Sequence, residues 1–315
     1  MRLATLLLSS MLVAGCDTPP RTLSIVSFNI WGGGANNGRP LSETVAVLQT
    51  LNADVFALQE VRAESAVCDP DDCLPGERGV ARELAQAIGY HLHEQSAQND
   101  LLWANAILSR YPLRSVLPQE LGVVLDVNGE SVYVFNVHLT DYPYQPYQLT
   151  GIAYGDAPLL DDAAAAVAAA ENARGAAVDR LLKVSAELPE AALTIVCGDF
   201  NEPSHLDWTR RAAESGRQPL TVPFPASRKL ADAGFVDAYR ASWPDEVAYP
   251  GLTWTSLPVP DPHQEHHDRI DFVYLKGKAV RVMDAAVAGE SGETADIVIQ
   301  PWPSDHRAVL VRVSY

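Results

Sequence analysis

The sequence of 315 residues is poor in cysteine, in basic side chains and in long apolar runs. Its four cysteines are too few for a disulfide-dense scaffold. Beyond residue 13 no apolar run is long enough to span a bilayer, which excludes a multi-span membrane protein. No segment repeats along the chain, which excludes solenoids and propellers built from short repeats.

Positive charge is scarce throughout the sequence. There are 23 Lys and Arg residues against 40 Asp and Glu, a formal net charge of −17. Proteins that bind long polyanions usually carry a basic patch or stripe, so this balance argues against tight binding to long nucleic acid. It does not exclude such binding, because a local basic rim can persist within an acidic protein.

The N-terminal residues have the composition of a secretory signal. Arg2 precedes an apolar run over residues 3–13, and small residues lead to Cys16. We predict a signal peptide over residues 1–15. Residues 13–16, Val-Ala-Gly-Cys, resemble a bacterial lipobox, which would make Cys16 the lipidated first residue of the mature protein and residues 16–22 a tether. The alternative is an ordinary signal peptide with an incidental cysteine. With the lipid, the predicted location is outside the cytoplasm, anchored to a membrane and facing the periplasm or the exterior.

After such a signal, 300 of the 315 residues remain, and we predict one α/β domain over residues 23–315. Apolar, β-branched runs at residues 23–30, 54–59, 131–138 and 193–197 alternate with helical patterns at 41–51 and 159–188. This alternation predicts an α/β core. Residues 140–158 are rich in Tyr and Pro, and we predict a loop there.

The other cysteines are interpreted from their surroundings. Cys68 and Cys73 enclose Asp-Pro-Asp-Asp, and in an exported protein this spacing predicts a small disulfide. The three aspartates could instead form a Ca²⁺ site or a solvated acidic turn. Cys197 lies in the apolar run LTIVCGDF and is predicted to be an inert buried thiol.

Polar side chains end or follow most of the predicted strands. Asn, Asp, Glu and His are unfavourable to bury unless they are paired or bind a metal. Their convergence at one end of a β-core therefore predicts a hydrolytic metal site. The residues concerned are Asn29, Glu60, His138, Asp199, Asn201, Asp271, Asp305 and His306.

The chemistry of these side chains suggests separate roles. A carboxylate such as Glu60, directly after a buried strand, is a ligand that Mg²⁺ favours. Asp199 and Asn201 lie two residues apart, so one can take a proton from water while the other positions it. His306 follows a carboxylate and can act as acid or base near neutral pH. Asp271 could orient its ring through the other nitrogen.

In this order the eight residues resemble the endonuclease/exonuclease/phosphatase superfamily, which has the deoxyribonuclease I-like fold. The resemblance runs from about residue 23 to residue 315. It implies a four-layer α/β/β/α sandwich with two packed mixed β-sheets and the site at one edge. It also implies that Asn29, Glu60 and Asp305 hold Mg²⁺ or Mn²⁺.

The same resemblance implies the catalytic roles. Asp199, positioned by Asn201, would activate or orient the attacking water. His306, supported by Asp271, would contact the scissile phosphate and stabilise its developing charge. His138 resembles the histidine of deoxyribonuclease I-like enzymes, which would act as a general acid or a phosphate ligand. The abasic-site endonuclease branch carries Tyr in that region, so a DNA-repair function is not expected.

Five further residues are predicted to bind substrate. Arg62 matches an arginine that contacts substrate in deoxyribonuclease I-like enzymes, although a surface ion pair is an equal alternative. Asn105 in NAILSR and Trp254 in GLTW lie in segments that also resemble the family. Tyr142 and Tyr144 follow His138 and, like the nearby Tyr147 and Tyr154, could stack on a sugar, a base or another ring of the substrate, or simply pack the loop.

The predicted function is hydrolysis of a small, nucleotide-like or lipid-derived phosphoester by a monomeric, metal-dependent enzyme. One alternative is an extracytoplasmic nuclease of the deoxyribonuclease I type. A second is a catalytically silent lipoprotein that binds a ligand. A histidine-rich segment before Asp271 adds a further choice, either a second metal such as Zn²⁺ or a solvated polar loop. Its residues are His263, His266, His267 and Asp268.

Overall fold

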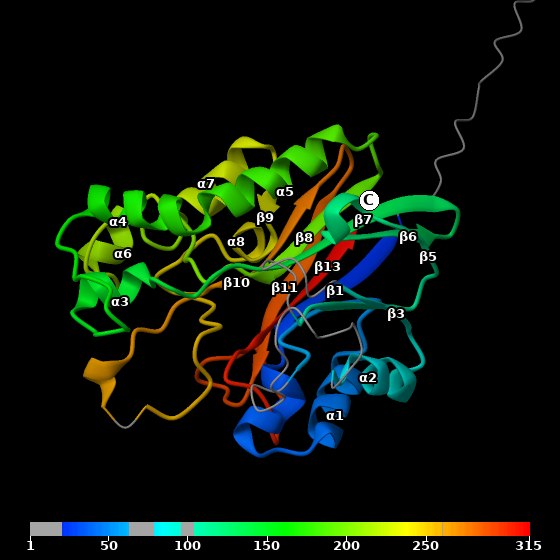
Figure 1. The fold of residues 1–315 in the computed structure, drawn as a ribbon, viewed down its shortest axis with the longest axis horizontal. Coiled ribbons are helices and arrows are strands. Elements are labelled where there is room, and N and C mark those ends of the chain that lie inside the picture. Colours follow the sequence, from blue (N-terminus) through cyan, green and yellow to red (C-terminus); the bar gives the residue numbers. More distant parts are fainter. Residues whose placement is uncertain (1–20, 63–78, 96–103, 260) are drawn as a thin grey trace, which may run out of the picture.

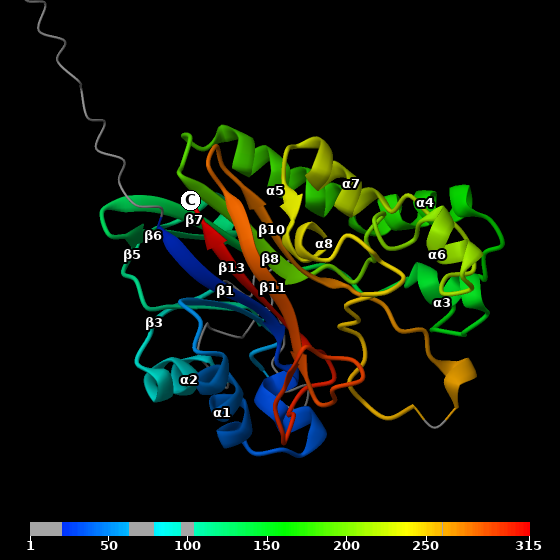
Figure 2. The ribbon, with the colours of Figure 1, turned by 180° about the vertical axis from the view of Figure 1, so that it is seen from behind.

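Two β-sheets packed face to face form the centre of the molecule, and helices cover the outer face of each (Figure 1). The computed structural model describes residues 21–62, 79–95, 104–259 and 261–315. The layers follow in the order helix, sheet, sheet, helix, and Figure 2 shows the same arrangement from behind. The predicted four-layer sandwich is confirmed.

The first sheet has seven strands and is mixed. Its central strand β1 pairs in parallel with β2 and antiparallel with β13. The central strands are rich in β-branched residues, which suit a pleated and buried surface. The strands lie in the order β12 (Ile297–Val298), β11 (Arg281–Gly289), β13 (Ala308–Ser314), β1 (Thr22–Asn29), β2 (Val55–Gln59), β4 (Ala106–Ser109) and β3 (His91–Glu94).

The second sheet has six strands and is also mixed. β7 and β8 are parallel, and the long helical crossover between them is what a parallel pair requires. The other pairs in this sheet are antiparallel. The strands lie in the order β5 (Leu113–Val116), β6 (Gly122–Val127), β7 (Glu130–His138), β8 (Leu193–Asp199), β10 (Asp271–Lys276) and β9 (Val236–Asp237).

The alternation of side chains along the strands separates three apolar layers. Ile25 and Val134 point between the sheets, where apolar side chains from both sheets form the central core. Phe56 points outward from the first sheet and Phe135 outward from the second. Because both faces of each sheet are buried, the central strands are apolar at consecutive positions. The covering helices are α1 (Leu41–Leu51) and α2 (Ala81–Ile88) on the first sheet, and α5 (Ala176–Glu187) and α7 (Pro225–Asp232) on the second.

The helix predicted over residues 159–188 is shorter and interrupted. It consists of α4 (Ala163–Ala170), a π-helical turn (Glu171–Gly175) and α5. The helix begins at residue 163 because the carboxylate of Asp162 caps it, accepting a hydrogen bond from the backbone N–H of Ala165 at 2.8 Å.

The prediction of an unbroken loop over residues 140–158 is wrong, because the segment contains α3 (Gln145–Thr150). Pro146 lies in the first turn of α3. Backbone N–H groups in a first turn make no hydrogen bond within the helix, so the absence of an N–H in proline costs no hydrogen bond there. Gly151 ends the helix with a φ of 80°, a conformation that favours glycine. Residues 215–229, whose Pro and Gly content also predicts a loop, include the start of α7. The remaining short helices are α6 (Arg210–Glu214) and α8 (Ala238–Ser242), with 3₁₀ turns at Trp31–Asn37, Pro118–Glu120 and Pro262–Gln264.

Several predictions concern residues outside the described ranges. They are the signal peptide, the lipidation of Cys16, and the disulfide or Ca²⁺ site around Cys68 and Cys73, and these stay predictions. Among the described residues, no helix has both the length and the apolar character needed to cross a membrane. Cys197 is fully buried in β8, which confirms the predicted buried thiol, and burial raises the pKa of that thiol.

Candidate active site

Strand register brings the predicted polar residues to one edge of the two sheets. In the first sheet, Asn29 ends β1 beside the end of its parallel neighbour β2, so Glu60 follows alongside. In the second sheet, Asp199 ends β8 and is paired with both His138 of β7 and Asp271 of β10. Residues far apart in the sequence therefore meet because the ends of neighbouring strands coincide.

The backbone at this edge is unusual. A Cβ on Gly198 would lie 2.2 Å from the carbonyl oxygen of Val137, so the close approach of β7 to β8 requires glycine. Glu60 and Asn201 have φ angles of 52° and 47°, in the left-handed region that non-glycine residues seldom occupy. Such strained positions cluster at functional sites.

The side-chain amide of Asn29 links the two sheets. Its Nδ2 donates to Glu60 Oε1 at 2.8 Å and to Asp199 Oδ2 at 3.1 Å. His138 faces the same two carboxylates, with Nε2 lying 3.5 Å from Asp199 Oδ2 and 3.9 Å from Glu60 Oε1. The four side chains thus converge on one point, with Asp199 Oδ2 at its centre.

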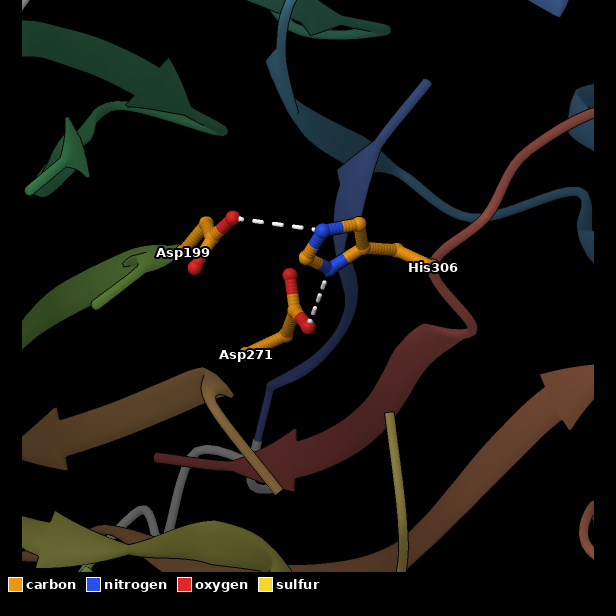
Figure 3. Close-up of side chains that lie close together, drawn as sticks. All are labelled: Asp199, Asp271 and His306. Carbon is orange, nitrogen blue, oxygen red and sulfur yellow. Dashed lines mark hydrogen bonds and ion pairs between the residues drawn. The ribbon is translucent and has the colours of Figure 1, made fainter. Parts of the chain in front are cut away.

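His306 lies between two carboxylates (Figure 3). Its Nδ1 is 2.9 Å from Asp271 Oδ2, and its Nε2 is 3.5 Å from Asp199 Oδ2. Burial alone would lower the pKa of His306, but the negative charges of Asp271 and Asp199 raise it well above its ordinary value. We therefore assign His306 as an imidazolium that directs an N–H toward Asp199. The support predicted from Asp271 is present.

The oxygen atoms beside this imidazolium fit a divalent cation. Burial raises the pKa of Asp305 to about 6, His306 opposes this shift, and the negative charges of Glu60 and Asp199 add to it. Carboxylates that face one another are stabilised by a cation between them, and Mg²⁺ and Mn²⁺ favour such oxygen ligands. Asn29 Oδ1 accepts one hydrogen bond, from the Trp31 N–H at 3.1 Å, and keeps a second lone pair.

A neighbouring set of side chains also has the spacing of metal ligands. One ligand atom each from Asp199, Asp271 and His306 lie within 4.8 Å of one another. Both ring nitrogens of His306 in this set already face carboxylates. Asn29, Glu60 and Asp305 offer only oxygen ligands, the kind that Mg²⁺ favours.

Part of this group lines one end of a cavity of about 880 Å³. The lining residues there are Glu60, His138, Asp199, Asp305 and His306, whereas Asn29 and Asp271 do not line it. The rest of the wall comes from the segment after β7, from the helical residues 173–180, and from two tryptophans, Trp31 and Trp254. A cavity of this volume accepts a molecule much larger than a phosphate group.

A model of the endonuclease/exonuclease/phosphatase family matches residues 26–306, nearly the whole described fold. The chain belongs to this family. An uncharacterized Caenorhabditis elegans protein, F14F9.5, is 27% identical over 313 residues, covering 93% of this chain and 91% of its own length. Membership makes this chain one of a family of phosphoesterases and nucleases, and so supports a hydrolase.

Solved structures share the fold at low sequence identity. A family member from Beutenbergia cavernae has 19% identity and a TM-score of 0.54, with 93% of this chain and 72% of that chain covered. A humanized D. rerio TDP2 has 18% identity and a TM-score of 0.55, with 93% and 99% covered. The 3′ phosphatase NExo from Neisseria has 18% identity and a TM-score of 0.55, with 92% and 98% covered.

Asn201 contacts Asp199 through its backbone. The N–H of Asn201, rather than its side chain, donates to Asp199 Oδ1 at 2.9 Å. The side-chain Nδ2 donates to the carbonyl oxygen of Leu139 at 2.9 Å. Asn201 therefore fixes the carboxylate and also ties the end of β8 to the residue that follows His138.

The predicted substrate-binding residues divide into two groups. Tyr144 and Trp254 line the cavity, whereas Arg62, Asn105 and Tyr142 are not among its lining residues. Arg62 is only 4% exposed, and burial lowers its pKa against the opposing charge of Glu94. Contact with substrate and an ion pair both stay predictions for this residue. Asn105 is also buried, while Tyr142 is exposed at the outer side of its segment.

The histidine-rich segment does not form a compact metal site within the part of the chain that the structure describes. His266 Nε2 faces Gln218 Oε1 at 2.7 Å, and Asp268 Oδ2 is 3.7 Å away. His267 Nδ1 instead accepts from the backbone N–H of Thr255 at 3.2 Å. Among the described residues, the His and carboxylate side chains with the spacing of metal ligands are those around Asp199, and not these histidines.

Arg174 is a site-lining residue that the sequence interpretation missed. It is 1% exposed, and the π-helical turn directs it inward. Its Nε and Nη2 donate to the carbonyl oxygens of Thr140 and Pro143, both at 2.9 Å, and its Nη1 donates to Gln145 Oε1 at 2.7 Å. A signal was available, because Arg174 lies four residues before the buried Val178 on the apolar stripe of the helix.

Replacing Arg174 with methionine is expected to lower the free energy of unfolding by about 3–5 kcal/mol, because buried acceptors lose a charged donor. Glu202 Oε2 lies 3.7 Å from Arg174 Nη1, and burial raises the pKa of Glu202 to about 7 against the opposing effect of Arg174. Urea unfolding measures the change. Arg180→Met on the same helix is the matched control, and an equal loss in both variants would contradict the assigned anchoring role.

Proposed function

We propose that the protein is a divalent-metal-dependent phosphoesterase that hydrolyses a small phosphoester by attack of water. The observation that carries the proposal is the convergence on Asp199 Oδ2. Asn29 Nδ2, His138 Nε2 and His306 Nε2 all lie within 3.5 Å of that oxygen, at one end of the cavity. A carboxylate faced by hydrogen-bond donors and imidazoles can hold a water molecule and accept its proton.

The residues around Asp199 would each have a defined task. Asp199, with Oδ1 fixed by the Asn201 N–H, orients the attacking water and takes its proton. The imidazolium of His306 donates from Nε2 to a phosphoryl oxygen, where negative charge develops. His138, whose Nε2 also faces this point, binds the phosphate or protonates the leaving oxygen. These residues bind and orient the reacting groups.

Asn29, Glu60 and Asp305 would hold Mg²⁺ or Mn²⁺. When bound, the ion supplies Lewis-acid polarisation of the phosphoryl group and neutralises its charge. Arg180 offers a further positive charge to an anionic substrate. It is exposed, lines the cavity and, among the described residues, has neither a hydrogen bond nor an ion pair.

Two alternatives differ in substrate or in activity. The structures of Neisseria NExo and of D. rerio TDP2 include DNA products, which supports a nuclease as the second candidate. The net charge of −17 favours a small substrate instead. A silent ligand-binding lipoprotein would need no such set of side chains, so the convergence on Asp199 Oδ2 supports the enzyme over it. We also propose that Cys16 is lipidated and that the lipid anchors a monomeric protein outside the cytoplasm. Mass spectrometry of the protein purified from the membrane fraction tests this lipidation.

We expect turnover of a chromogenic phosphodiester or of its matching monoester in Mg²⁺ or Mn²⁺, and loss of at least about 10³-fold in rate with chelator. Rates are measured on both esters with each metal and after adding the metal back. The ratio of diester to monoester turnover identifies the ester class. Hydrolysis that persists in chelator would contradict the metal-dependent mechanism. Absence of turnover on both esters and on a DNA oligonucleotide would favour the silent ligand-binding protein.

A further inference from the structure

Aromatic rings form a continuous row from the catalytic end of the cavity outward. The ring centroid of Trp254 lies 4.9 Å from that of His306. Trp254 Nε1 then donates to the hydroxyl of Tyr147 at 3.2 Å, and the ring of Tyr147 lies 6.0 Å from that of Tyr154. Tyr144 packs edge-on against Tyr147 at 4.8 Å. A group attached to the scissile phosphate would meet this row directly.

The tyrosine hydroxyls are already used as donors. Tyr144 donates to Asp268 Oδ2 at 3.0 Å and Tyr147 to Glu265 Oε1 at 2.5 Å. The hydroxyl of Tyr154 donates to Asp141. Because their hydrogens point to these carboxylates, the tyrosines present rings rather than free donors to the cavity. What the row offers to a ligand is therefore mainly aromatic surface.

The row is also held in place before any ligand arrives. Arg174 binds the carbonyl oxygens of Thr140 and Pro143, which fixes the segment that carries Tyr144. The edge-on contacts between neighbouring tyrosines restrict their rotation. A pre-organised aromatic wall loses little conformational entropy on binding. Flat rings favour offset or edge-to-face partners, which a flexible acyl chain does not provide.

We propose that this tyrosine-lined end of the cavity binds an aromatic ring carried by the substrate, so that the substrate is a small phosphoester bearing a phenyl-like or nucleobase ring. The inference rests on the proposed phosphoesterase function for the placement of the phosphate. The cavity of about 880 Å³ has room for both the phosphate and such a ring.

The test measures binding by calorimetry on the full chain with Mg²⁺, using phosphonates whose P–C bond is not hydrolysed. Phenylphosphonate and cyclohexylphosphonate have the same charge and similar size and differ in aromaticity. We expect phenylphosphonate to bind about three- to tenfold more tightly. The methylenephosphonate analogue of thymidine monophosphate forms a third arm. If it binds still more tightly than phenylphosphonate, the ring is a nucleobase, and if more weakly, a simple aryl group.

Variants test whether the preference comes from the aromatic row. Tyr154 is 37% exposed, so Tyr154→Leu should fold, and we expect it to bring the phenyl-to-cyclohexyl ratio close to one. Tyr154→Phe keeps the ring and should keep the ratio. Tyr249→Leu is the matched control, because Tyr249 is also exposed and does not line the cavity.

Equal affinity for the two phosphonates, no measurable binding of either, or a ratio unchanged in Tyr154→Leu would overturn the inference. Failure of the proposed function would give a different result. The protein would show no metal-dependent turnover but would still bind phenylphosphonate more tightly than cyclohexylphosphonate. The two results are independent because the calorimetric readout requires no hydrolysis.

Discussion

Replacing Asp199 with alanine is expected to lower kcat/KM by about 10⁴-fold or more, the largest effect of any single substitution considered for this protein. Asp199 Oδ2 is the oxygen on which Asn29, His138 and His306 converge, so its loss removes both the proton acceptor and the group that aligns the others. The measurement is the initial rate on the better of the two chromogenic esters, at saturating and at limiting concentrations.

Asp199→Asn separates charge from shape. In the wild type the Asn201 N–H donates to Asp199 Oδ1 at 2.9 Å, and an asparagine at position 199 keeps an oxygen that can accept this hydrogen bond. The asparagine cannot take a proton from water. We expect a loss close to that of the alanine variant. Asp284→Ala is the control, since Asp284 forms an exposed ion pair with Arg312 away from the cavity. Near-normal turnover by Asp199→Asn, with the fold retained by circular dichroism, would refute the role of Asp199 as the base.

The positions of several candidate site residues were predictable because they lie at the ends of apolar strands. A buried strand with a polar terminus, as in FNVH or CGDF, is recognisable from local sequence, and the shared edge follows from the α/β alternation. Residues 41–51 were likewise predictable as a helix with the observed bounds, because the apolar spacing over this segment is regular and Pro40 precedes it.

Contacts between distant segments could not be predicted in the same way. The sequence around Asn29 does not indicate that its amide joins Glu60 to Asp199 across two sheets, because this depends on how the sheets pack. The Ala-rich segment is predicted by propensity to be one continuous helix, and nothing local marks the π-helical turn within it.

The wall of the cavity was the least predictable part of the site. The Tyr- and Pro-rich composition of residues 140–158 suggested a loop near His138, and that proximity is present. Composition alone did not distinguish Tyr144, which lines the cavity, from Tyr142, which lies outside it. That choice depends on α3 and on the anchoring by Arg174, and both are tertiary features.

Asp271→Asn is expected to lower kcat by about 10²–10³-fold while leaving KM within a few-fold of the wild-type value. Asp271 Oδ2 lies 2.9 Å from His306 Nδ1. In the proposed arrangement Asp271 does not contact the substrate, so its replacement should change KM little. Its negative charge helps to keep the imidazole protonated, and its oxygen fixes the ring so that Nε2 faces Asp199.

The pH profile distinguishes this role from a merely structural one. His306 acts in its protonated form, so activity should fall as the pH rises through its pKa, which Asp271 and Asp199 hold well above the ordinary value. Without the charge of Asp271 that pKa drops, and the alkaline limb of kcat should move to lower pH by at least about one unit. Asp296→Asn is the control. The carboxylate of Asp296 accepts a hydrogen bond from the N–H of Val287 in β11, and its replacement should leave the alkaline limb in place. A limb that stays fixed in Asp271→Asn would show that His306 does not act as the charged donor.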